Sequence, residues 1–246
     1  MKNRGQLIGE FMLIVIGVLV AFMVESWLQQ RHDDDLRDEY LVRLTADLEV
    51  DHYGLENLIE FFAAIRDFGL ETLVWLKSSK SADEKAMLAA YYAAERWAFA
   101  PVDNTYQDLQ NTGNIRLLDD LDFRMLLTAY HTNAIKMRDA WDPPVTYRKL
   151  VRGAIPPEVQ LTIRELCPTT INHDTEISLN AQCPLPKSAT EGLSDDMESL
   201  RSIPGIVEIL SYHITEVDVA VRLFQQQDDY ARDLLSRLNG ESPSTQ

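Results

Sequence analysis

The sequence predicts an all-α protein, in which one N-terminal transmembrane helix continues into a long helix and packs in an antiparallel helical bundle. Leucine and aromatic residues recur every three or four positions over long segments, as on the buried face of a helix. No stretch alternates apolar and polar residues for long between hairpin turn signals, and only 10 of the 246 residues are glycine. At 246 residues the chain can form one large domain or two small ones, and a hydrophobic content of 46% is enough for a core.

The N-terminal segment is long enough to cross a membrane. Fourteen uninterrupted apolar residues, Phe11 to Val24, are flanked by Glu10 and Glu25. A helix over residues 7–28 rises roughly 33 Å, which matches a hydrocarbon core of about 30 Å. We expect Trp27 to lie at the membrane interface, with Glu25 as the polar boundary beside it.

A cleaved signal peptide and a buried core helix are the alternatives for this segment, since the strictly apolar part is short and Lys2 and Arg4 supply a basic flank. The sequence Val24-Glu25-Ser26 is a poor small-x-small cleavage site, and the bulky Trp27 follows it. The segment is therefore predicted to be retained as an anchor.

One stripe of this helix is a candidate contact face. Gly17 and Ala21 have the small-xxx-small spacing that lets two membrane helices approach closely, and Glu10 lies on the same stripe. We predict that these three residues mediate packing within the membrane. The alternative is that Glu10 reaches the headgroups and that glycine and alanine are simply common in spans.

The two cysteines and the basic tail predict the topology. A short basic tail before a first span favours the cytoplasm for residues 1–6 and export for the rest of the chain. Cys167 and Cys183 bracket a polar stretch that would otherwise be a long unstructured loop. A disulfide between them would contribute roughly 3 kcal/mol and would need an oxidising compartment. The alternative is two free thiols in a cytosolic protein.

The predicted helices after the span follow in order along residues 29–142, the first part of the helical domain. Apolar periodicity continues from the span to about residue 76, either straight or with a hinge near Asp33. Ser81 with Glu84 forms a capping box for a second helix that runs to Pro101. A short third helix is predicted at residues 105–113, with Asp103 or Asn104 as its N-cap. The next helix is predicted at residues 121–142, with Asp119 or Asp120 at its start.

Two further segments complete the predicted domain. Residues 143–202 contain repeated prolines and are predicted to be an insertion of loops and short helices, closed by the disulfide. Residues 203–240 form a long C-terminal helix that begins at Pro204 and completes the bundle. Residues 241–246 are a free tail.

Some side chains have two interpretations. Tyr91, Tyr92 and Trp97 have the composition of a ligand-stacking box, but this spacing is more typical of core packing. The acidic run at residues 33–35 has the composition of a cation site but is more typical of a solvated helix face. His213 lies on the apolar stripe of the last helix and is interpreted as a core histidine.

Two blocks resemble a family of bacterial single-span membrane proteins whose function is uncharacterised. The first is "IGEFMLIVIGVLVAFMVESW" and the second is "TYQDLQNTGNIRLLDDLDFRMLLTAYH". The resemblance covers roughly residues 5–135 and implies a single anchor, in the bacterial inner membrane, with a helical body. The family has no catalytic residues to transfer to this chain.

The expected function is a binding or structural role. The formal net charge of −16 argues against binding nucleic acid or anionic lipid through a broad basic surface, which leaves proteins or small cationic species as partners. No histidine has zinc-ligand spacing, and no nucleotide or nucleophile motif is present, so neither an enzyme nor a cofactor is expected. We expect an accessory or structural protein that docks on a membrane protein complex or forms a homo-oligomer, through its span and exported domain. The alternative is a periplasmic small-molecule sensor that acts through a partner.

Overall fold

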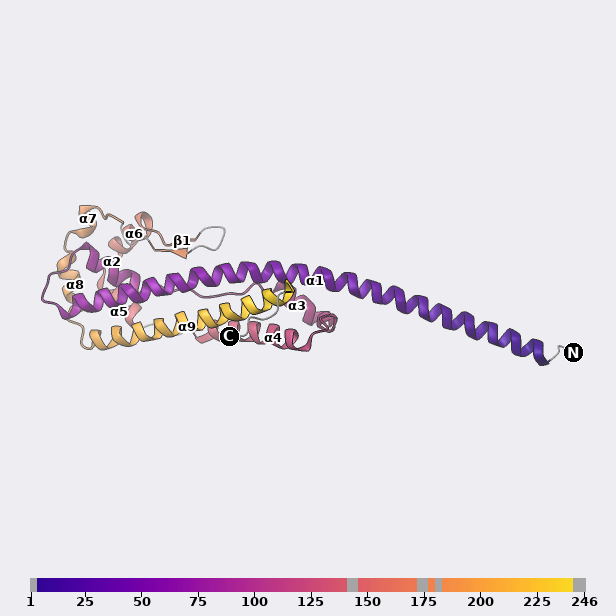
Figure 1. Cartoon of the computed structure of the whole chain (residues 1–246). Coiled ribbons are helices and arrows are strands. Elements are labelled where there is room, and N and C mark those ends of the chain that lie inside the picture. Colours follow the sequence, from indigo (N-terminus) through magenta and orange to yellow (C-terminus); the bar gives the residue numbers. More distant parts are fainter. Residues whose placement is uncertain (1–3, 141–145, 172–176, 180–182, 241–246) are drawn as a thin grey trace. The chain divides into compact units, whose positions relative to one another are not determined.

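The chain is helical in the computed structural model, which describes residues 4–140, 146–171, 177–179 and 183–240 (Figure 1). The elements in chain order are α1 (Arg4–Lys77), α2 (Glu84–Ala93), α3 (Asn104–Asn111), the 3-10 helix η1 (Asn114–Leu117), α4 (Leu121–Ala140), α5 (Thr146–Ala154), α6 (Pro157–Leu166), β1 (Thr170–Ile171), β2 (Ile177–Ser178), α7 (Lys187–Thr190), α8 (Leu193–Arg201) and α9 (Ile206–Leu238). The strands β1 and β2 pair antiparallel over two residues each. The predicted all-α class is confirmed, apart from this small strand pair.

The first helix, α1, is continuous over 74 residues and has no break at Asp33. Its N-terminal part is long and apolar enough to span a membrane, and none of its most apolar window is buried. The predicted long apolar helix at the N-terminus is therefore confirmed.

The chain divides into two compact units, and α1 contributes to both. Unit 1 consists of residues 1–47 and 103–124. In it, Asp108 of α3 accepts hydrogen bonds from the Tyr40 hydroxyl and the Arg43 guanidinium of α1, each at 3.2 Å. Leu44 and Leu109 are fully buried in the same unit, so an apolar core accompanies these polar contacts.

Unit 2 consists of residues 48–102 and 125–246. Here α1 and α9 run antiparallel: the Phe62 ring lies 5.1 Å from the Phe224 ring, and Arg66 pairs with Asp218 at 3.1 Å. At Gly69 an added Cβ would lie only 2.8 Å from a side-chain carbon of Ile214. A glycine therefore allows the two helices to approach closely at this point.

The helix boundaries correct some of the predictions. The N-cap of α2 is Asp83, whose carboxylate accepts a hydrogen bond from the Ala86 amide at 2.9 Å, so the predicted capping box at Ser81 is wrong. At α4 the predicted cap is confirmed, because Asp120 accepts from the amides of Asp122 and Phe123 at 2.8 and 3.2 Å.

Candidate ligand-binding site

The early end of α2 creates the candidate site. The sequence predicts a helix that continues to Pro101, yet α2 ends at Ala93. The carbonyl of Ala90 accepts from the Tyr147 hydroxyl at 3.3 Å, and that of Ala93 accepts from Nε2 of His213 at 2.8 Å. The Ala94 carbonyl accepts from Arg148. These side chains satisfy carbonyls that a longer helix would have satisfied, so the helix ends without a polar penalty.

The segment after α2 is not helical and lines a cavity of about 380 Å³ with Glu95, Arg96 and Trp97. We call this cavity the arginine pocket, because Arg148 of α5 and Arg164 of α6 line it together with Arg96. Ile163 and the segment Cys167–Thr169 complete one wall. The pocket therefore lies wholly within unit 2.

A network of ion pairs holds the charged side chains of the pocket. The Glu95 carboxylate lies 2.5 Å from Arg152 and 3.3 Å from Arg148. The Arg152 guanidinium also lies over the Tyr91 ring, 3.3 Å from its centroid. Burial lowers the pKa of Arg152 from its ordinary value, and the adjacent Glu95 opposes this effect. Arginine still remains protonated, so one carboxylate balances the positive charges of two partly exposed arginines, Arg148 and Arg152.

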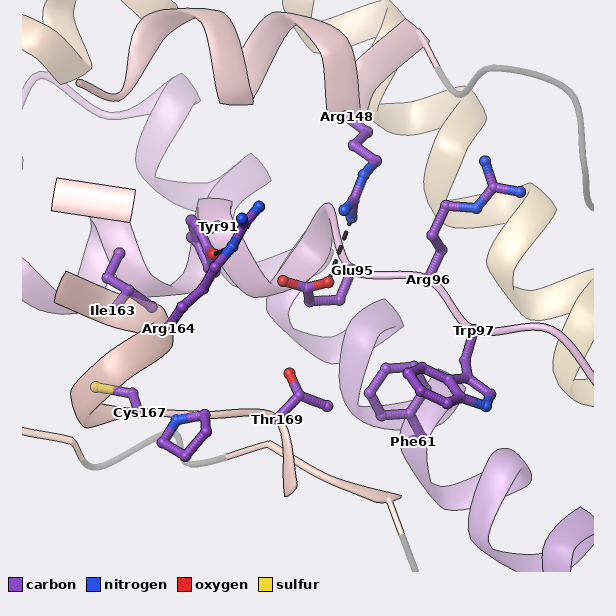
Figure 2. Close-up of a pocket in the computed structure, with 11 residues that line it drawn as sticks. Phe61, Tyr91, Glu95, Arg96, Trp97, Arg148, Ile163, Arg164, Cys167 and Thr169 are labelled. Atoms are coloured by element: carbon purple, nitrogen blue, oxygen red, sulfur yellow. Dashed lines mark hydrogen bonds and ion pairs between the residues drawn. The ribbon is translucent and has the colours of Figure 1, made fainter. Parts of the chain in front are cut away.

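The second group of the pocket centres on Tyr91. Nε of Arg164 donates a hydrogen bond to the Tyr91 hydroxyl at 3.3 Å, and this hydrogen bond raises the pKa of Arg164. Tyr91 is almost fully buried, so it fixes the base of the Arg164 side chain. In the view of Figure 2, Tyr91 and Arg164 lie on one side of Glu95, and Phe61 and Trp97 lie on the other.

The lining of the pocket is net positive. It contains three arginines and one glutamate, a formal charge of +2, in a chain whose total is −16. The planar guanidinium group of arginine can donate two parallel hydrogen bonds to the oxygens of a carboxylate or a phosphate. This lining therefore favours the binding of an anionic ligand. The overall charge of the chain, which indicated cationic small molecules as partners, does not describe this local surface.

The predicted disulfide between Cys167 and Cys183 is confirmed, with a Cα–Cα distance of 5.6 Å. It anchors the pocket wall after α6, where the Tyr92 hydroxyl donates to the Cys167 carbonyl at 3.4 Å. Burial raises the pKa of Tyr92 to about 12, so this hydroxyl stays protonated and able to donate. The predicted stacking residues thus divide: Tyr92 is core, while Tyr91 and Trp97 also line the pocket.

The residues predicted to contact the membrane are all exposed along α1. Glu10, Gly17 and Ala21 lie on the apolar part of the helix, and no heavy atom comes within 4 Å of a Cβ added at Gly17. Trp27 is 55% exposed, with the Arg31 guanidinium over its ring at 5.1 Å, and Glu25 is exposed nearby. The packing role of the stripe and the interfacial role of Trp27 and Glu25 remain predictions.

The acidic run at residues 33–35 lies beside a second cavity, of about 560 Å³, in unit 1. Its charged lining is Asp33, Asp34, Arg37, Arg116 and Asp119, a formal charge of −1, and we call it the acidic cavity. Within the described residues, no group of three or more histidine, cysteine or acidic side chains is arranged to hold a metal ion.

The sequence interpretation missed the arginine pocket. The available signal was four basic residues within residues 148–164 of a strongly acidic chain. The pocket also needs Phe61 and the segment after α2, which no local pattern connects with those arginines. No protein-family model, curated protein or solved structure in the comparisons matches the chain.

Proposed function

We propose that this chain is a membrane-anchored accessory protein whose exported helical domain binds a small molecule in the arginine pocket. The observation that carries the proposal is the pocket itself, where Arg148 and Arg164 converge with Phe61 and Trp97 on one cavity of about 380 Å³. This volume falls in the range of about 300–1,000 Å³ that is typical of small-molecule sites. The pocket favours the sensor alternative over a purely structural role for the exported domain.

The proposed location is the bacterial inner membrane, with a single span and the helical domain in the periplasm. The disulfide between Cys167 and Cys183 supports an oxidising compartment for that domain. The apolar part of α1 supports the anchor. The antiparallel course of α1 and α9 supports an antiparallel bundle as the architecture of the domain.

We propose binding rather than catalysis at this site. Arginine is neither a nucleophile nor a general base at neutral pH. The one carboxylate of the lining, Glu95, accepts from both Arg148 and Arg152, so its oxygens are engaged. These side chains can orient a ligand through charge and hydrogen bonds.

The proposed route to a partner is the stripe of Glu10, Gly17 and Ala21, since the surface at Gly17 is open to a second helix. The partner is a membrane protein complex or a second copy of this chain. A Gly17→Ile variant should lose the partner or the oligomer in mild detergent, while Val18→Ile should not. Unchanged assembly of both variants would exclude the stripe as a contact.

The binding proposal is tested with the full-length protein in lipid nanodiscs and four probes: benzoate, phenyl phosphate, phenol and phenylethylamine. We expect at least one probe to raise the thermal unfolding midpoint, because a ligand that binds only the folded state stabilises it. A Trp97→Ala variant should lose this shift, and a Trp75→Phe variant, changed outside the pocket, should keep it. If no probe shifts the wild type, or if Trp97→Ala keeps the full shift, the proposed function is wrong.

A further inference from the structure

The arginine pocket holds guanidinium N–H groups that the described residues leave unused. Arg148 donates through Nη1 to Ala94 and Glu95, and no described residue accepts from its Nη2 or Nε. Arg164 donates through Nε to Tyr91, and no described residue accepts from either of its Nη atoms. Each side chain is therefore fixed at one nitrogen and keeps others available to a ligand.

The charge balance around these two arginines is incomplete. Glu95 is shared by Arg148 and Arg152, and no carboxylate among the described residues pairs with Arg164. Behind the lining, Nε and Nη1 of Arg152 are buried without an acceptor in the described part of the chain. Arg148 and Arg152 are 30% and 13% exposed, so their excess positive charge over the single Glu95 carboxylate is costly until an anion neutralises it.

The opposite side of the pocket is aromatic. Phe61 and Trp97 both line the cavity, and Figure 2 draws them on the side of Glu95 away from Arg164. Trp97 is 37% exposed, so part of its indole ring is accessible to a ligand. A flat apolar group would bury this surface.

We propose that the arginine pocket binds a small aromatic anion, whose carboxylate or phosphate accepts from the unused N–H groups of Arg148 and Arg164 and whose ring lies against Phe61 and Trp97. This inference rests on the proposed function and names the class of its ligand. The shared chemistry is an oxyanion on an aromatic ring, and benzoate and phenyl phosphate distinguish its two forms.

The test measures the affinity of benzoate, phenyl phosphate, phenol and phenylethylamine by calorimetry, with full-length protein in nanodiscs and empty nanodiscs as the blank. We expect an anion to bind and to bind more tightly than the neutral phenol. An Arg164→Gln variant should weaken anion binding about tenfold to a hundredfold, because a hydrogen bond to a charged group is lost. Arg164 is exposed, so this variant should fold.

The matched control is Arg222→Gln, which removes an exposed arginine that pairs with Asp218 on α9. It should leave anion affinity unchanged. If phenol or phenylethylamine binds and the anions do not, the anion assignment is wrong and the proposed function stands. Equal anion affinity in wild type and Arg164→Gln also overturns the assignment. If none of the four probes binds, the proposed function fails, and this inference fails with it.

Discussion

The arginine pocket and the acidic cavity are both lined by arginines and carboxylates, but arginines outnumber carboxylates in the first and carboxylates outnumber arginines in the second. At the acidic cavity of unit 1, Arg37 pairs with Asp34 and Asp119 of the lining and with the neighbouring Asp38, at 3.3–3.5 Å. In the arginine pocket of unit 2, one carboxylate, Glu95, is shared by two arginines. The carboxylates around Arg37 are 50–82% exposed, so water hydrates their excess charge. Arg148 and Arg152 are only 30% and 13% exposed, so their excess charge is less well hydrated and favours an anionic ligand.

The largest expected effect of a mutation comes from the carboxylate at the centre of the pocket. A Glu95→Gln variant leaves Arg152 without its counter-charge, and both side chains are mostly buried, at 16% and 13% exposure. We expect the free energy of unfolding to fall by about 3 kcal/mol, the lower end for breaking a buried ion pair. Urea unfolding monitored by circular dichroism measures this change. A loss below about 1 kcal/mol would show that the pair behaves like a surface pair.

Removal of the disulfide gives the next largest expected effect. It should affect the two units differently, because unit 1 contains no cysteine. Replacement of Cys167 and Cys183 by serine should lower the free energy of unfolding by about 3 kcal/mol. Hydrogen exchange should become faster in α6, which ends at the pocket wall, and should not change in α3. Equal changes in both helices would indicate that the disulfide stabilises the whole chain rather than the pocket end.

The contrast between α1 and α2 shows which parts of the fold could be predicted. The periodicity of α1 is local, so its sequence predicts a long helix directly. The end of α2 depends on Tyr147, Arg148 and His213, which lie more than 50 residues away in the sequence. The prediction from local helix propensity therefore placed the end of α2 too far along the chain. The disulfide could be predicted because the chain has only two cysteines, whereas the pocket joins segments that no pattern connects.

His213 makes the same region sensitive to pH. Burial lowers its pKa below the ordinary value of 6.5, against the opposing effects of the Ala93 carbonyl and Glu216. The folded state then binds fewer protons than the unfolded state just below pH 6.5, so stability is full above that pH and falls as the pH falls through this window.

The predicted result is a thermal unfolding midpoint that decreases as the pH falls from 7.5 to 5, measured by calorimetry. A His213→Gln variant, which keeps an N–H donor for Ala93 but does not titrate, should show a smaller decrease. A His32→Gln variant, changed at an exposed position on α1, is the control and should follow the wild type. The assignment is wrong if His213→Gln follows the wild type as well.

The smallest effect is expected in unit 1. An Asp108→Asn variant weakens the pair with Arg43, whose side chain is 41% exposed, while Asp108 is 37% exposed. Exposed pairs contribute about 0–1 kcal/mol, so urea unfolding should show a loss below about 1 kcal/mol. If the free energy of unfolding falls as much as in Glu95→Gln, the Asp108–Arg43 pair of unit 1 and the Glu95–Arg152 pair of unit 2 do not differ in strength as we expect.

The most direct test of the central claim, that the arginine pocket is built for an aromatic anion, is a crystal structure of the full-length protein with 4-iodobenzoate. The predicted result is an anomalous iodine peak beside Phe61 and Trp97, with the carboxylate about 3 Å from Arg148 and Arg164. Iodine bound only in the acidic cavity, or no ordered ligand at a saturating concentration, would contradict the account.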